Sequence, residues 1–115
     1  MKVERRKYPH RSESANLVYF AIFYPDKTLK QQGMGKTINI SEGGILLETH
    51  EKLIDDQLIS LSLGLNNETV DLEAKLVHFT KNKEGLYHSG LSFIIDSIKK
   101  TEAIKKYITI FEQMK

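Results

Sequence analysis

Two neighbouring segments of alternating apolar and polar residues place the strongest constraint on the fold. They are QLISLSLGL at residues 57–65 and ETVDLEAKLVHF at residues 68–79. Their alternate apolar residues are Ile59, Leu61, Leu63 and Leu65 in the first segment and Val70, Leu72, Ala74 and Leu76 in the second. Because successive side chains of a strand point to opposite faces, this period of two predicts two strands that each bury one face. Only Asn66 and Asn67 separate the segments, which predicts a tight hairpin.

The remaining strands are predicted from shorter apolar segments. At residues 77–79 the alternation shifts by one residue, which indicates a bulge or a barrel corner. Residues 16–24 (NLVYFAIFY) are apolar at nearly every position and predict a strand buried on much of both faces. Its aromatic residues, which we assign to the core, are Tyr19, Phe20, Phe23 and Tyr24. PDKT at residues 25–28 predicts a turn, and further short strands are predicted at residues 35–40, 44–50 and 86–95.

The apolar period lengthens from two to about 3.6 residues after Asp96 and Ser97, either of which can cap a helix. An amphipathic helix is therefore predicted over about residues 97–114. Its apolar stripe consists of Ile104, Tyr107, Ile108 and Phe111, with Ile98 and Met114 extending it. Six or so short strands followed by one helix predict a mainly β fold, a small closed antiparallel barrel with a helical lid.

The chain has 115 residues, the size of one domain. We assign residues 1–15 to an amino-terminal arm and residues 16–115 to the barrel and its helix. The absence of cysteine excludes disulfides and thiolate chemistry and is typical of a cytoplasmic protein. No segment is apolar for long enough to span a bilayer. The net charge of +2 is too small to indicate bulk nucleic-acid binding.

The positive charge is instead concentrated near the amino terminus, in VERRKYPHRSES at residues 3–14. Four of the 17 basic residues lie between Arg5 and Arg11. The segment is polar and contains Pro9, so we expect an extended, mobile arm rather than a helix. Such a concentration of cations indicates that the arm binds an anionic ligand.

A second polar segment, NISEGG at residues 39–44, lies between two predicted strands, so a short turn is expected there. Asn39 and Ser41 have short side chains that can bond to the turn backbone or reach a ligand. Gly43 and Gly44 permit a positive φ and let the backbone approach a flat ring closely. Taken alone, the segment indicates no more than a Ser/Gly-rich turn.

Together, the two segments resemble the PilZ domain family, whose members bind the bacterial second messenger cyclic di-GMP. The motif of that family is R-x-x-x-R in an amino-terminal arm, followed by D/N-x-S-x-x-G at the start of a later strand. The second half is present here as Asn39, Ser41 and Gly44. Gly90 and Phe93 match a late strand of the family in which Gly precedes Phe by three residues. The resemblance covers nearly the whole chain and implies a split barrel of six antiparallel strands with a C-terminal helix.

The first half of the motif is altered. Counted from Arg6, the second arginine position holds His10, and an arginine follows one residue later at Arg11. A neutral imidazole cannot form the paired hydrogen bonds that a guanidinium makes with phosphate or with a guanine edge. Three explanations stay open: the arm slips to present Arg11, His10 acts as a weaker donor and stacking surface, or the site has decayed. In the family, the residue before the motif bears on whether one messenger or a stacked pair is bound, and Arg5 leans toward a pair.

The resemblance implies a cyclic di-GMP receptor that passes the messenger level to an unidentified partner protein in motility, adhesion or exopolysaccharide control. The implied ligand-binding residues are Arg5, Arg6, His10, Arg11, Asn39, Ser41, Gly43 and Gly44. One alternative, favoured by His10, is a degenerate PilZ-like interaction scaffold that binds no nucleotide. Another is a small barrel that binds RNA or single-stranded DNA, but this needs exposed aromatic residues on a basic sheet face, whereas the basic residues cluster on the arm.

The other polar residues indicate no further chemistry. The histidines lack the spacing of zinc ligands, so we expect no metal and no cofactor besides the messenger. His78 and His88 are interpreted as partly buried or surface residues of strands. No histidine or acid stands where it would activate Ser41 as a nucleophile. We therefore expect neither an enzyme nor a protein that binds nucleic acid or inserts into a membrane.

Overall fold

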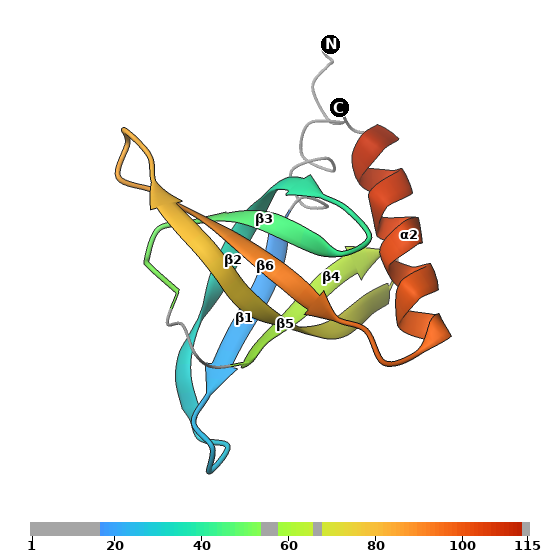
Figure 1. The fold of residues 1–115 in the computed structure, drawn as a ribbon, viewed down its shortest axis with the longest axis horizontal. Helices are drawn as coiled ribbons and strands as arrows, with labels where there is room; N and C mark the ends of the chain where they lie inside the picture. Colours follow the sequence, from blue (N-terminus) through green and yellow to red (C-terminus); the bar gives the residue numbers. More distant parts are fainter. Residues whose placement is uncertain (1–16, 54–57, 66–67, 114–115) are drawn as a thin grey trace.

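The computed structural model describes residues 17–53, 58–65 and 68–113. These residues form six strands and one helix. The elements are β1 (Leu17–Phe23), β2 (Leu29–Ile40), β3 (Gly44–Thr49), β4 (Leu58–Leu65), β5 (Glu68–Lys81), β6 (Tyr87–Ile94) and α2 (Ile98–Gln113). All strand pairs are antiparallel, and the sheet closes on itself in the order β1-β2-β3-β6-β5-β4 (Figure 1). The predicted barrel with a C-terminal helix is confirmed.

The alternation in β4 and β5 produces the interior of the barrel as predicted. The two strands pair from Leu58 opposite Lys75 to Leu65 opposite Glu68, which confirms the hairpin. The buried residues of this pair are Ile59, Leu61, Leu63, Leu72 and Ala74, while Val70 and Leu76 pack at the edge of the core. The side chain of Leu65 lies outside the described part of the chain. One face of each strand therefore supplies the core, and the other faces outward.

The β1–β2 hairpin differs from the prediction in two respects. β2 begins at Leu29, six residues before the predicted start at Gly35. The prediction missed these residues because this part of the hairpin projects beyond the core (Figure 1) and has no alternation of buried and exposed side chains. Of the four aromatic residues assigned to the core, only Phe20 is buried. Tyr19, Phe23 and Tyr24 are exposed because they lie on or beyond the outer face of β1, which no other described layer covers.

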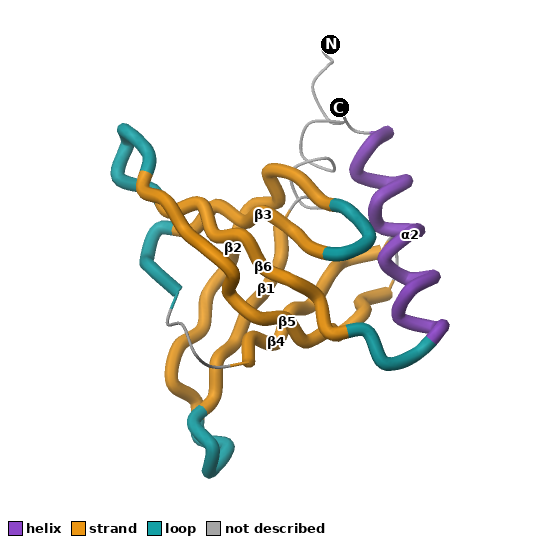
Figure 2. The backbone as a smooth tube through the Cα atoms, in the orientation of Figure 1, coloured by secondary structure: helices purple, strands orange, loops and turns teal. Residues whose placement is uncertain are grey.

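The expected irregularity at residues 77–79 is a β-bulge. Leu76 pairs with Leu91 and His78 pairs with Gly90, so Val77 is an extra residue in β5. A second register shift lies in β2 between Thr37 and Asn39. Bulges bend a strand and re-aim its side chains. Both lie near the turn that joins β2 to β3, drawn as a short loop in Figure 2.

Helix α2 begins where the sequence predicts. The hydroxyl oxygen of Ser97 accepts a hydrogen bond from the backbone N–H of Lys100 at 3.2 Å, so Ser97 is the N-cap. The helix buries Ile104, Tyr107 and Phe111 and packs against β4 and β5. The phenol oxygen of Tyr107 lies 2.9 Å from the hydroxyl oxygen of Thr37 in β2, and both side chains are buried. This hydrogen bond ties the helix to the strand that precedes the NISEGG turn.

The prediction that Ile98 extends the apolar stripe of the helix is wrong. Ile98 is 78% exposed. It precedes Ile104 by six residues, which rotates it by about 120° from that residue around the helix axis. Met114 lies outside the described residues. The described part of the chain contains no helix whose length and apolar character would let it cross a membrane.

Candidate functional site

The NISEGG turn is held in place by the backbone of β6. The N–H of Ser41 donates to the carbonyl oxygen of Gly44 at 2.9 Å and closes the turn. The carbonyl oxygen of Gly43 accepts from the N–H of Phe93, also at 2.9 Å. Within the turn, the Oδ1 atom of Asn39 accepts from the N–H of Ile40 at 2.9 Å, as expected for a short polar side chain at this place. The turn is therefore rigidly joined to the barrel wall.

The two glycines have different roles, and neither is the one expected from backbone freedom. Gly85 is the glycine with positive φ in the described residues, so Gly43 and Gly44 do not use the left-handed region. A Cβ at Gly44 would instead collide with the carbonyl oxygen of Leu91 in β6. A Cβ at Gly43 would meet nothing within 4 Å. Gly44 is thus required by the close approach of two backbones, while Gly43 faces open space.

An open depression of about 390 Å³ lies beside this turn. Its lining consists of residues 39–41 and 43–46 of the β2–β3 hairpin, 77–78 of β5 and 90–92 of β6. Asn39, Ser41 and Gly43 are exposed at its edge. The lining contains hydrogen-bonding groups and apolar surface, but no lysine or arginine among the described residues. It suits a ligand with polar edges, and it offers no charge of its own for an anion.

His78 also forms part of this lining, whereas the sequence predicts only a partly buried or surface residue of a strand at this position. It lies opposite Gly90 at the β5 bulge. A Cβ at Gly90 would lie 2.7 Å from Cε1 and 2.9 Å from Nε2 of His78, so the imidazole occupies the space left by the missing side chain. The signal that could have identified His78 is the phase shift at residues 77–79, because a bulge changes which residues face the neighbouring strand.

The structure describes four of the eight residues that were predicted to bind the ligand. Asn39, Ser41, Gly43 and Gly44 lie together at the depression. The arm residues Arg5, Arg6, His10 and Arg11 lie outside the described residues, so their part in the site stays a prediction. Gly90 and Phe93 acquire a physical role, since Gly90 accommodates the His78 ring and the Phe93 backbone holds the turn.

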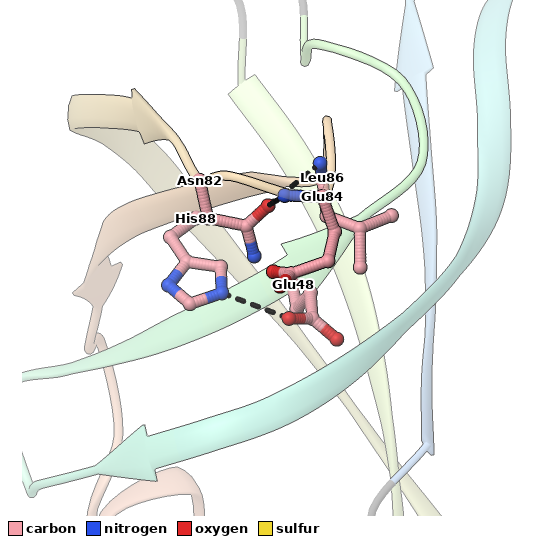
Figure 3. Close-up of polar contacts among 5 residues, drawn as sticks. All are labelled: Glu48, Asn82, Glu84, Leu86 and His88. Atoms are coloured by element: carbon pink, nitrogen blue, oxygen red, sulfur yellow. Dashed lines mark hydrogen bonds and ion pairs between the residues drawn. The ribbon is translucent and has the colours of Figure 1, made fainter.

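Within the described ranges, no group of three or more His, Asp or Glu residues is placed to hold an ion. His88 in β6 instead pairs with Glu48 in β3, with Nε2 and Oε2 2.9 Å apart (Figure 3). Nearby, Oδ1 of Asn82 accepts hydrogen bonds from the N–H groups of Glu84 and Leu86 and closes the β5–β6 turn.

Solved structures with a similar fold are known. The PilZ domain of CeSA from a cellulose-synthesizing bacterium superposes with a TM-score of 0.59 at 16% identity, covering 85% of this chain and 95% of that one. MrkH of K. pneumonia superposes with a TM-score of 0.55 at 20% identity, covering 84% of this chain and 45% of MrkH. The apo state of MrkH gives 0.54, also at 20% identity, with 84% and 46% coverage.

The chain thus spans less than half of MrkH and nearly all of the CeSA domain. No curated protein sequence matches it significantly. The sequence model of the PilZ domain matches residues 4–109, which include the basic arm, the NISEGG turn and most of α2. The chain belongs to the PilZ domain family.

Proposed function

We propose that this protein binds cyclic di-GMP at the depression beside the NISEGG turn and passes the messenger level to a partner protein. The observation that carries the proposal is the position of Asn39, Ser41 and Gly43 at the edge of an open depression of about 390 Å³. Asn39 and Ser41, together with Gly44 beside them, are motif positions of a family of cyclic di-GMP receptor domains. The volume lies in the range of small-molecule sites.

The polar groups of the turn are suited to the edge of a guanine base. Guanine presents the acceptors N7 and O6 side by side. Oδ1 of Asn39 accepts from Ile40, and the amide nitrogen of the same side chain is a donor that suits these acceptors. The hydroxyl of Ser41 can donate or accept, and Gly43 lets a ring approach the backbone without a Cβ in the way.

The charge of the ligand must be met from elsewhere in the chain. Cyclic di-GMP carries two phosphates, but the described lining holds no lysine or arginine. The family motif brings guanidinium groups to this site from the amino-terminal arm, where the arginines are Arg5, Arg6 and Arg11. We therefore propose that the arm contributes the cations. Arg5, which precedes the motif, favours a stacked pair of messengers over a single one.

Calorimetric titration of the protein with cyclic di-GMP tests the proposal, with cyclic di-AMP and GMP as matched controls. We expect binding of cyclic di-GMP that weakens as salt is added, because the arm acts through charge. Cyclic di-AMP should bind far more weakly, since adenine carries a donor where guanine carries the O6 acceptor. No binding at high micromolar messenger would contradict the proposal.

The second candidate is an interaction scaffold with a PilZ fold that binds no nucleotide. The observation that favours it is His10 at the second arginine position of the arm motif. It predicts no heat with any of the three nucleotides, and an unchanged thermal midpoint in their presence. A ligand that binds only the folded state must raise that midpoint, so the same titration and a melting curve separate the candidates.

A further inference from the structure

The side of the depression opposite the turn is formed by the β5 bulge. Val77, the extra residue of the bulge, is 65% exposed, and His78 beside it is exposed as well. Both residues line the depression together with Gly90. An exposed valine next to an exposed imidazole gives this side of the depression an aliphatic group and a planar ring. Neither residue belongs to the arm or to the NISEGG turn.

The position of the imidazole is determined by Gly90. The three atoms nearest to a Cβ built on Gly90 are Cε1, Nε2 and Nδ1 of His78, at 2.7, 2.9 and 3.1 Å. The ring therefore packs against the backbone of β6, and any larger residue at position 90 would displace it. The ring has a defined place at the depression even though much of its surface is open to solvent.

We propose that His78, supported by Val77, is the wall on which one guanine base of the ligand stacks. The edge of the base would then face Asn39 and Ser41 across the depression, while one face would lie on the imidazole. Stacking of a base on an aromatic ring contributes to affinity without reading the sequence of donors and acceptors. His78 thus contacts the face of the base, whereas Asn39 and Ser41 of the turn bind its edge. The inference rests on the proposed function.

Three variants measured by calorimetry against cyclic di-GMP test this role of His78. We expect His78→Ala to lower affinity about 5- to 30-fold, in line with the loss of one base–aromatic stack. His78→Phe keeps a flat ring without its N–H groups and should retain most of the affinity. His88→Ala removes the same side chain from β6 outside the lining and should leave affinity unchanged. Circular dichroism melting checks that each variant is folded.

Gly90→Ala supplies an independent route to the same conclusion. The added methyl group displaces the His78 ring without removing it, so we expect a loss of affinity similar to that of His78→Ala. When Gly90→Ala is combined with His78→Ala, the methyl group no longer meets the ring, so the two losses of affinity should not add. Additive losses would show that Gly90→Ala acts elsewhere and would overturn the proposed link.

The NMR signal of the His78 Hε1 proton gives a readout that a purely structural role would not move. A stacked guanine should shift this signal upfield by its ring current on titration with cyclic di-GMP, while the corresponding signal of His88 stays in place. If the native protein binds but His78→Ala has unchanged affinity, or the His78 signal does not shift, the proposed stacking is wrong and the proposed function stands. No binding by the native protein would remove both.

Discussion

The outer surface of β3 and β6 has two ends, one covered by a side-chain pair and the other bordering the depression. At one end Glu48 lies directly opposite His88, and the two side chains pair across the strands (Figure 3). At the other end the same row continues with Leu46 opposite Gly90 and Gly44 opposite Ser92. There the depression lies open. The first end is filled by this side-chain pair, whereas at the second end the ring of His78 from β5 lies over Gly90 and the depression opens beside the turn.

This difference indicates how the barrel makes room for a ligand without a gap in its core. Both ends share the same backbone pairing, and the buried residues beneath them belong to one cluster. The depression is open to solvent, although core residues such as Ile45 and Leu91 also contribute to its lining. A site of this kind can change without refolding the barrel, so the predictions below separate effects on the fold from effects on the ligand.

The largest expected effect comes from adding a side chain at Gly44, where the backbones of β3 and β6 approach closely. Gly44→Ala would place a Cβ against the carbonyl oxygen of Leu91, and neither backbone can move without breaking strand pairs. We expect a loss of about 2 kcal/mol in the free energy of unfolding, a melting midpoint lower by about 10 °C, and no binding of cyclic di-GMP. Gly43→Ala is the matched control, since its Cβ meets nothing within 4 Å. Equal stability of the two variants would contradict this reading of the turn.

The next effect concerns the positive charge, which the described lining of the depression lacks. Arg6→Ala should abolish or weaken binding by about 30-fold or more, because a charge-assisted contact contributes on the order of 2 kcal/mol. The melting midpoint should stay that of the native protein, and calorimetry with melting measures both quantities. An unchanged affinity would show that Arg6 is misassigned.

The altered arm motif is tested by two further variants. If the arm slips to present Arg11, Arg11→Ala should be nearly as damaging as Arg6→Ala, and His10→Ala should be mild. If His10 is the second donor, affinity should rise as the pH falls through about 6.5, since the protonated ring carries a charge and a second N–H. We favour slippage, because imidazole is a poor substitute for the guanidinium fork. A gain at acidic pH that disappears in His10→Ala would overturn that preference.

A smaller effect is expected behind the turn, where Thr37 and Tyr107 share a buried hydrogen bond. Tyr107→Phe leaves the Thr37 hydroxyl without this partner and should cost about 1 kcal/mol in urea denaturation. Burial raises the pKa of Tyr107 above its ordinary value of 10.0, although the hydrogen bond from Thr37 opposes this. Its contribution to stability is therefore fully present below pH 10 and is lost as the pH rises through the raised value. The alkaline loss should be smaller in Tyr107→Phe, and an equal loss would contradict this assignment.

The smallest effect is expected at the filled end. Glu48→Ala breaks a pair whose side chains are 26% and 23% exposed, and such pairs contribute less than about 1 kcal/mol. Urea denaturation should detect at most this loss, and affinity for cyclic di-GMP should not change. A large loss of affinity would show that the two ends of the strand pair are not independent.

The barrel itself was predictable because its signals are local. Alternation in residues 57–65 and 68–79, the cap at Ser97 and the phase shift before Phe79 each depend on a few neighbouring residues. The failures arise where burial depends on distant parts of the chain. Tyr19 and Phe23 are exposed because they lie on a face that no described layer covers. Ile98 is different, because its position off the helix stripe follows from the spacing of helix residues alone.

The sequence by itself determined the strands, the helix, the family and the polar residues of the NISEGG turn, because period, capping and motif are all properties of short segments. Only the tertiary structure decided that Gly44 is needed for its approach to Leu91, and that His78 of β5 lies over Gly90 of β6 beside that turn. These relations join residues that are far apart in the chain. They depend on the register of three strands and on one bulge, and no short segment of sequence encodes how such registers combine.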